Sequence, residues 1–137
     1  MSRFVLDTSV AASWFFEDEG GEYATSVLES LNEREAIVPA LWQLEIANVL
    51  VVAERRGRCS EAEAVRFIEL LENLPITIDE DTAYRALHAT YQIAREYGLT
   101  AYDAAYLELA MRLGVPLATM DRQLAEAAQK AGVSIHK

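Results

Sequence analysis

Four acidic side chains stand out among the 22 Asp and Glu residues because they follow or interrupt apolar stretches. They are Asp7, Glu45, Asp103 and Asp121. Carboxylates gathered at one place repel one another strongly unless a cation lies among them. An all-oxygen ligand set suits Mg²⁺ or Mn²⁺ rather than zinc. Two such ions about 4 Å apart can acidify water and stabilise the attacking and leaving oxygens of a phosphodiester displacement.

Two of these carboxylates follow predicted strands. Residues 4–6 are Phe, Val and Leu, a short apolar run that favours a strand covered on both faces. Asp7 follows that run, and Asp121 follows a predicted strand over 115–119. Ligands of open α/β sheets bind outside the carboxyl ends of the strands. Either residue could instead cap the helix that begins after it, and the local sequence leaves both roles open.

Glu45 lies one turn into a predicted helix over residues 41–55. Its neighbours three and four positions away include Leu41 and Trp42, which form a poor solvent-facing surface. A carboxylate on such a face needs a partner. In the functional interpretation that partner is a metal ion. In the structural interpretation Glu45 is buried and is paired with an Arg or capped by Asn48.

Asp103 begins a predicted helix over residues 101–113. The positive N-terminus of that helix favours a carboxylate. The pattern Thr100-x-x-Asp103 is also that of a capping box. The capping role and a role in a site do not exclude each other.

Short apolar runs alternate with amphipathic stretches, which is typical of an α/β fold with a parallel sheet and helices on its faces. The predicted strands are 4–6, 36–38, 76–78, 115–119 and an edge strand 133–135. An acidic turn at 17–21 separates a predicted helix over 9–16 from a second one that ends near residue 32. A capping box formed by Ser60 and Glu63 begins a predicted helix that ends at residue 71. The other predicted helices are 41–55, 81–97, 101–113 and 121–131. The carboxyl ends of parallel strands meet at one edge, so we expect the four carboxylates to converge there.

The length of 137 residues predicts one domain with a substantial core. No apolar run is long enough to span a bilayer, and the N-terminus lacks the pattern of a signal peptide. The single Cys59 excludes an internal disulfide and fits a reducing compartment. We therefore expect a cytoplasmic protein.

The four acidic motifs, in this order and at these positions, resemble those of the PIN domain ribonucleases, and among them the VapC-type toxins of type II toxin–antitoxin pairs. The motifs are Val5-Leu6-Asp7-Thr8-Ser9, Leu44-Glu45-Ile46-Ala47-Asn48, Thr100-Ala101-Tyr102-Asp103-Ala104-Ala105-Tyr106 and Thr119-Met120-Asp121. The resemblance covers essentially the whole chain. It implies a Rossmann-like three-layer sandwich with a parallel sheet of about five strands.

The resemblance also implies functional roles. It implies that Asp7, Glu45, Asp103 and Asp121 ligate Mg²⁺ or Mn²⁺, and that Thr8, Ser9 and Thr119 position Asp7 and a metal-bound water. It implies hydrolysis of RNA, with transfer and ribosomal RNA among the targets of relatives. It further implies a homodimer and a cognate antitoxin that often places an Arg in the acidic pocket, where a guanidinium forms bidentate pairs.

The net charge of −10 opposes binding to RNA phosphates, so binding would depend on the metal ions and on local basic patches. The best patch is Arg55, Arg56 and Arg58. These cations also complement the C-terminus of the predicted helix over 41–55, which is the structural alternative.

Other α/β proteins with acidic pockets fit the sequence less well. A phospho-acceptor receiver domain needs a Lys near the last strands, but the first Lys is Lys130. A haloacid-dehalogenase-type phosphatase needs an Asp two residues after the nucleophile, where this chain has Ser9. The remaining alternatives are a PIN fold used only to bind proteins and a PIN nuclease of RNA processing outside a toxin–antitoxin pair.

Overall fold

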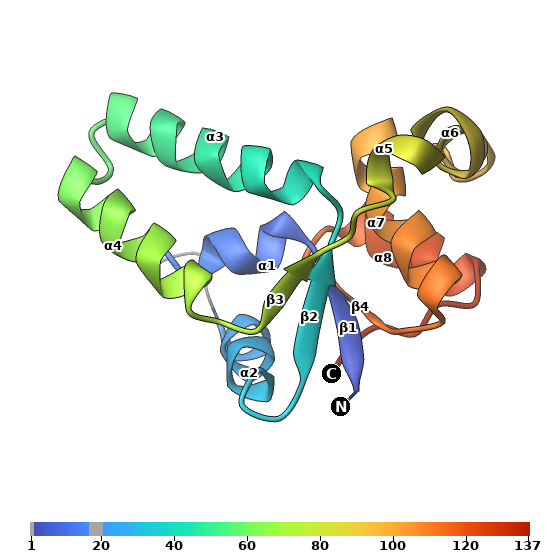
Figure 1. Ribbon diagram of the computed structural model, residues 1–137, viewed down its shortest axis with the longest axis horizontal. Coiled ribbons are helices and arrows are strands. Elements are labelled where there is room, and N and C mark those ends of the chain that lie inside the picture. The colour runs from blue at the N-terminus through green and yellow to red at the C-terminus, as the bar shows by residue number, and fades with distance from the viewer. Residues whose placement is uncertain (1, 17–20) are drawn as a thin grey trace.

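The structure is a computed structural model, and it describes residues 2–16 and 21–137. Its elements are β1 (Arg3–Leu6), α1 (Thr8–Ser13), α2 (Glu22–Ser30), β2 (Glu35–Val38), α3 (Leu41–Arg55), α4 (Glu61–Glu72), β3 (Ile76–Ile78), α5 (Thr82–Arg85), the π-helical turn η1 (Ala86–Thr90), α6 (Tyr91–Tyr97), α7 (Ala101–Leu113), β4 (Leu117–Ala118) and α8 (Arg122–Lys130). Helices α1 to α4 lie on one side of the sheet and α5 to α8 on the other (Figure 1). The predicted α/β fold is therefore confirmed.

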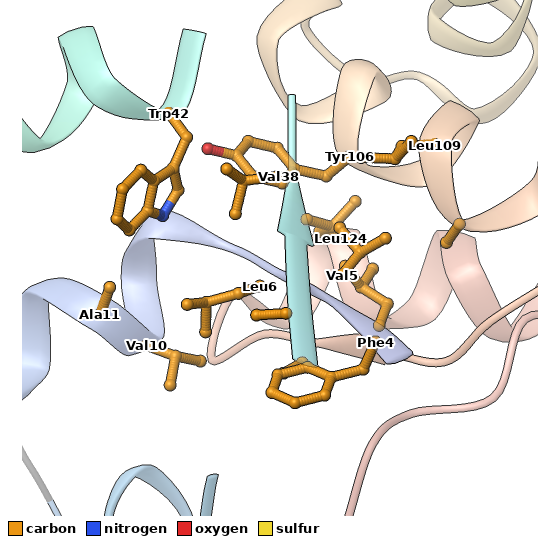
Figure 2. Close-up of a cluster of buried hydrophobic side chains, with 14 of the residues drawn as sticks. Phe4, Val5, Leu6, Val10, Ala11, Val38, Trp42, Tyr106, Leu109 and Leu124 are labelled. Carbon is orange, nitrogen blue, oxygen red and sulfur yellow. The ribbon is translucent and has the colours of Figure 1, made fainter. Parts of the chain in front are cut away.

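Strand β1 lies inside a parallel sheet whose strand order is β3-β2-β1-β4. Phe4, Val5 and Leu6 are fully buried, because the sheet is covered by helices on both faces. Figure 2 shows these side chains among others from α1 and α7, such as Val10 and Leu109. The apolar run at the start of the sequence thus forms the centre of the core, and it ends at Asp7.

The predicted sheet of about five strands has four in the described parts of the chain. The predicted edge strand 133–135 contributes a single bridge, between Leu117 and Ile135, because β4 offers only two residues to pair with. The predicted strand 115–119 is correspondingly shorter, since Pro116 has no N–H to donate to a ladder. The chain still packs against the sheet beyond this bridge, where the His136 ring stacks on Phe4 with ring centroids 4.0 Å apart.

The predicted helices agree closely with α3 and α7, whose bounds match in full. The predicted helix 81–97 is interrupted by the π-helical turn η1, which the hydrophobic pattern did not indicate. The predicted acidic turn lies, except for Gly21, outside the described residues. Within the described chain, no helix is both long and apolar enough to cross a membrane.

One carboxylate at the carboxyl edge of the sheet, that of Asp79, is paired with a cation of the chain itself. Asp79 follows β3 and accepts hydrogen bonds from Arg112 of α7 at 2.8 and 3.2 Å. Burial acts to raise the pKa of Asp79, but the hydrogen bonds and charge of Arg112 outweigh it and hold that pKa below its usual value. Arg112 also binds Glu108 one turn earlier in α7, at 2.9 Å. This ion pair network fixes the sheet edge to α7.

The Ser60–Glu63 capping box that begins α4 gives a direct test of this local structure. Ser60 accepts from the Glu63 amide at 3.1 Å, and Glu63 accepts from the Ser60 amide at 2.9 Å. We expect Ser60→Ala to lower the free energy of unfolding by about 1 kcal/mol in a urea titration, because a helix N–H loses its acceptor. Ser26→Ala, in the middle of α2, is the matched control and should change stability little. An equal loss in both variants would contradict the capping role.

Candidate active site

The four predicted carboxylates lie on elements that end or begin at the carboxyl edge of the sheet. Asp7 follows β1 and Asp121 follows the neighbouring β4, whereas Glu45 and Asp103 lie near the N-termini of α3 and α7. The pKa of Asp103 is raised to about 6, first by partial burial and then by the charges of Asp121, Asp7 and Glu45. The four groups are therefore within range of one another's charge.

Asp7 is held by hydroxyl groups and does not cap α1 with its side chain. It occupies the N-cap position, but its carboxylate accepts no bond from the helix amides. Its Oδ2 instead accepts from Ser9 Oγ and from Thr119 Oγ1, each at 2.7 Å. Burial, at 5% exposure, raises the pKa of Asp7, the two hydroxyl bonds oppose that rise, and the charges of Glu45 and Asp121 add to it.

The same two hydroxyl groups connect the ends of β1 and β4. Ser9 Oγ accepts from the Met120 amide at 2.9 Å, and Thr119 Oγ1 accepts from the Asp121 amide at 3.0 Å. Each hydroxyl thus donates to Asp7 and accepts from the loop that carries Asp121. The positions of these two carboxylates are coupled through Ser9 and Thr119.

Glu45 has neither of the partners that the structural alternative supplied. Its Oε1 accepts from Thr8 Oγ1 at 2.9 Å and from the Tyr106 hydroxyl, and those two hydroxyl oxygens are 2.8 Å apart. Tyr106 was not predicted as a site residue. Its position could have identified it, because a residue three positions after Asp103 lies on the same side of the helix. A buried tyrosine hydroxyl also needs a hydrogen-bond partner.

Asp103 and Asp121 both lie at helix starts, but they use different atoms there. Asp121 is the N-cap of α8, and its Oδ1 accepts from the Leu124 amide at 3.1 Å, as the structural alternative predicted. At α7 the capping oxygen belongs to Thr100, which accepts from the backbone amide of Asp103 at 3.1 Å. The Asp103 carboxylate is therefore not needed for this capping bond.

None of the four carboxylates forms an ion pair with Arg or Lys among the described residues, in contrast to Asp79. Their hydrogen bonds occupy Oδ2 of Asp7, Oε1 of Glu45 and Oδ1 of Asp121, and leave the second oxygen of each without a partner in residues 2–16 and 21–137. In those same ranges, no three Asp, Glu, His or Cys side chains are close enough to hold one ion between them. The site thus has carboxylate oxygens that are available as ligands but are too far apart to share one ion in this arrangement.

The basic patch lies away from these carboxylates. Arg55 ends α3 and is ten residues from Glu45, which corresponds to about 15 Å along the helix axis. Arg56 and Arg58 follow in the turn before α4, at the end of α3 that projects from the sheet (Figure 1). The guanidinium of Arg58 lies 4.2 Å from the centre of the Phe16 ring.

Comparisons with known proteins identify the family to which this chain belongs. Residues 4–130 match the model of the PIN domain family. The chain is 33% identical over 124 residues to Ribonuclease VapC3 of Pyrobaculum aerophilum. The aligned residues cover 90% of this chain and 93% of that protein. The chain belongs to the PIN domain family.

Two solved structures show how closely the fold matches. The crystal structure of PAE2754 from Pyrobaculum aerophilum has a TM-score of 0.74 at 25% identity, and covers 93% of this PIN domain chain and 86% of that chain. A toxin–antitoxin complex from Klebsiella pneumoniae has a TM-score of 0.59 at 21% identity, with 86% of each chain covered. The second likeness supports the fold alone.

The repulsion among the PIN domain carboxylates predicts a stability change in Asp103→Asn. The pKa of Asp103 is about 6 in the fold, against about 3.9 in an unfolded chain. The folded protein therefore binds the extra proton between those values, and the free energy of unfolding falls as pH rises through that window. In chelator at neutral pH, we expect Asp103→Asn to be more stable than the wild type by about 1 kcal/mol.

The comparison is made by thermal melting of both proteins in chelator over a range of pH. The advantage of Asp103→Asn should shrink as the pH falls toward the lower end of the window, because the wild-type carboxyl is then protonated too. The Thr100 capping bond uses a backbone amide and survives the substitution. A variant that melts below the wild type at neutral pH would show that Asp103 stabilises the helix start and is not strained by its neighbours.

Proposed function

We propose that this protein is a Mg²⁺- or Mn²⁺-dependent endoribonuclease and the toxin of a toxin–antitoxin pair, active in the cytoplasm. The observation that carries the proposal is the set of four uncompensated carboxylates at the carboxyl edge of the sheet. The name of the 33% identical relative, Ribonuclease VapC3, supports RNA as the substrate. Transfer and ribosomal RNA are the substrate classes that the family suggests.

The donor set fits a hard divalent cation. All candidate ligands are carboxylate oxygens, which Mg²⁺ and Mn²⁺ prefer. The spare oxygens of Asp7, Glu45 and Asp121, together with Asp103, would hold the ion. The pKa of Asp103 is raised by its burial and then by the charges of the other three carboxylates. The charge of the ion would cancel that repulsion, so that the four groups could draw together.

When bound, the ion would supply a Lewis acid that acidifies water and neutralises charge on the scissile phosphodiester. The chain's own residues would orient the ligands. Ser9 and Thr119 fix one oxygen of Asp7, and Thr8 contacts Glu45 in the same manner. These neutral donors stabilise carboxylate charge without cancelling it, so the site keeps its attraction for a cation.

RNA must approach a protein of net charge −10. We propose that Arg55, Arg56 and Arg58 contact RNA phosphates at a distance from the scissile bond. The separation of about 15 Å along α3 from Glu45 corresponds to several nucleotides, since the phosphates of one strand of a duplex follow one another about every 3.4 Å along its axis. This proposal concerns binding and not the chemical step.

We propose a cognate antitoxin as the protein partner, bound partly through an Arg at the carboxylates. A structural neighbour of this chain is itself a toxin–antitoxin complex. An apolar groove between α3, α4 and β3 supports an additional contact, and its lining includes Trp42, Ile46 and Ile68. We also propose a homodimer, as is usual in the family.

The catalytic proposal is tested with Asp7→Asn. We expect it to abolish Mn²⁺-dependent cleavage of cellular RNA and any growth arrest, because a buried ligand charge is lost. Thr119→Ala is the graded comparison and should reduce cleavage less, since it removes one hydroxyl bond to Asp7 and no charge. The measurement is cleavage of purified RNA in Mn²⁺, with the 5′ ends of the products mapped and with circular dichroism to verify the fold. Near-wild-type cleavage by a folded Asp7→Asn protein would contradict the proposal of a metal-dependent nuclease and favour a PIN fold that only binds proteins.

The antitoxin proposal is tested with the double variant Glu45→Gln, Asp103→Asn. We expect weaker binding of the co-expressed antitoxin at low salt, because two acceptors for a guanidinium lose their charge. Binding should persist in part, since buried apolar anchors contribute more than charged contacts at the rim. The measurement is a titration of purified antitoxin into wild type and variant. Equal affinity at low salt would exclude an Arg in the acidic pocket while leaving the groove contact possible.

A further inference from the structure

Tyr106 is a fully buried residue whose hydroxyl group nevertheless contacts the candidate site. It is the largest of the fully buried side chains, and it projects from α7 with its hydroxyl directed toward the side of the sheet where α3 lies (Figure 2). That hydroxyl donates to Oε1 of Glu45 and lies 2.8 Å from Thr8 Oγ1. Three elements, α1, α3 and α7, thus meet at one carboxylate oxygen.

We propose that Tyr106 is a positioning residue that, together with Thr8, holds Oε1 of Glu45 and so leaves Oε2 as the oxygen offered to a divalent ion. The inference rests on the proposed metal-dependent function and concerns how the ligand is presented. It gives a role in the site to a residue that lies within the third acidic motif but to which the sequence analysis assigned none.

The physical reason for such a clamp is the freedom of the Glu side chain. Glu45 is only partly buried, and a free Glu has three rotatable bonds whose ordering costs free energy when a ligand binds. Two hydroxyl donors on one oxygen restrict that freedom before an ion arrives. Residues that orient metal ligands in this way typically contribute 10- to 100-fold to metal affinity.

The alternative is that Tyr106 is only a core residue whose hydroxyl uses Glu45 as a convenient acceptor. Both interpretations predict some loss of stability when the hydroxyl is removed, because its hydrogen bond is buried. They differ in what happens when the ion is added. A positioning residue changes the response to metal, whereas a core residue does not.

The test is Tyr106→Phe, which keeps the buried ring and removes only the hydroxyl. Melting temperature is recorded against Mn²⁺ concentration for the wild type, Tyr106→Phe and the control Thr77→Val. Thr77 donates to Oε1 of Glu35 at 2.8 Å, so this control also loses a hydroxyl bond to a carboxylate, but at the amino end of β2. We expect the Mn²⁺ concentration at half-maximal stabilisation to rise about 10-fold or more in Tyr106→Phe and to stay unchanged in Thr77→Val.

A double-mutant cycle shows whether Tyr106 acts through Glu45. In a Glu45→Gln background, Tyr106→Phe should cause little further change in the Mn²⁺ midpoint, since the ligand it positions has lost its charge. An equal additional shift in that background, or an unchanged midpoint in Tyr106→Phe alone, would overturn the inference.

Two controls separate this inference from the proposed function. A wild type whose melting is indifferent to Mn²⁺ would contradict the proposed function itself and this inference with it. A wild type that responds, with a Tyr106→Phe variant that responds equally, would leave the proposed function intact and show Tyr106 to be a core residue. If Tyr106→Phe does not fold, Thr8→Val removes the other donor to Oε1 and must shift the midpoint in the same direction.

Discussion

Repulsion among carboxylates is the constraint on which the carboxyl edge of this sheet depends. The parallel arrangement of β1 and β4 brings Asp7 and Asp121 to that edge, and the helix starts at α3 and α7 add Glu45 and Asp103. The raised pKa of Asp103, due to its burial and to the charges of the other three, records the cost of that arrangement. Local strain of this kind persists only where the surrounding structure over-determines it. Here the buried core of β1 and the nearly continuous burial along α7 do so.

A comparison with Asp79 shows that the repulsion is not a general property of this edge. Asp79 also follows a strand, yet Arg112 neutralises it and lowers its pKa against the effect of burial. The fold can therefore place a partly buried cation next to a carboxylate at the strand ends. Within the described chain, it does so for Asp79 and not for the four site residues. The described chain thus supplies a cation to one carboxylate at this edge and leaves the four site carboxylates without one.

The sequence predicted the elements that positioned the site better than it predicted the contacts inside it. The apolar run before Asp7 and the periodic helices α3 and α7 follow from local patterns, and their bounds agree with the structure. The interruption of helix 81–97 and the loss of the fifth strand depend on tertiary packing, which no local pattern reports. The partners of Glu45 lie 37 and 61 residues away, at Thr8 and Tyr106, so only the folded chain could identify them. The site roles of the four acidic residues remain predictions.

The chemical type of the contacts explains how the chain can hold an uncompensated acidic site and still fold. Asp7 and Glu45 each accept two bonds from hydroxyl groups, and every one of those donors is neutral. A neutral donor lowers the cost of burying a carboxylate but leaves its charge in place, whereas an Arg would remove the attraction for an incoming cation. The two hydroxyls that bind Asp7, those of Ser9 and Thr119, also accept from backbone amides of the loop after β4, so the same atoms that stabilise the charge fix that loop. One set of hydrogen bonds therefore stabilises the fold and leaves the carboxylate charge in place. This is possible because a Ser or Thr hydroxyl donates and accepts at a single oxygen.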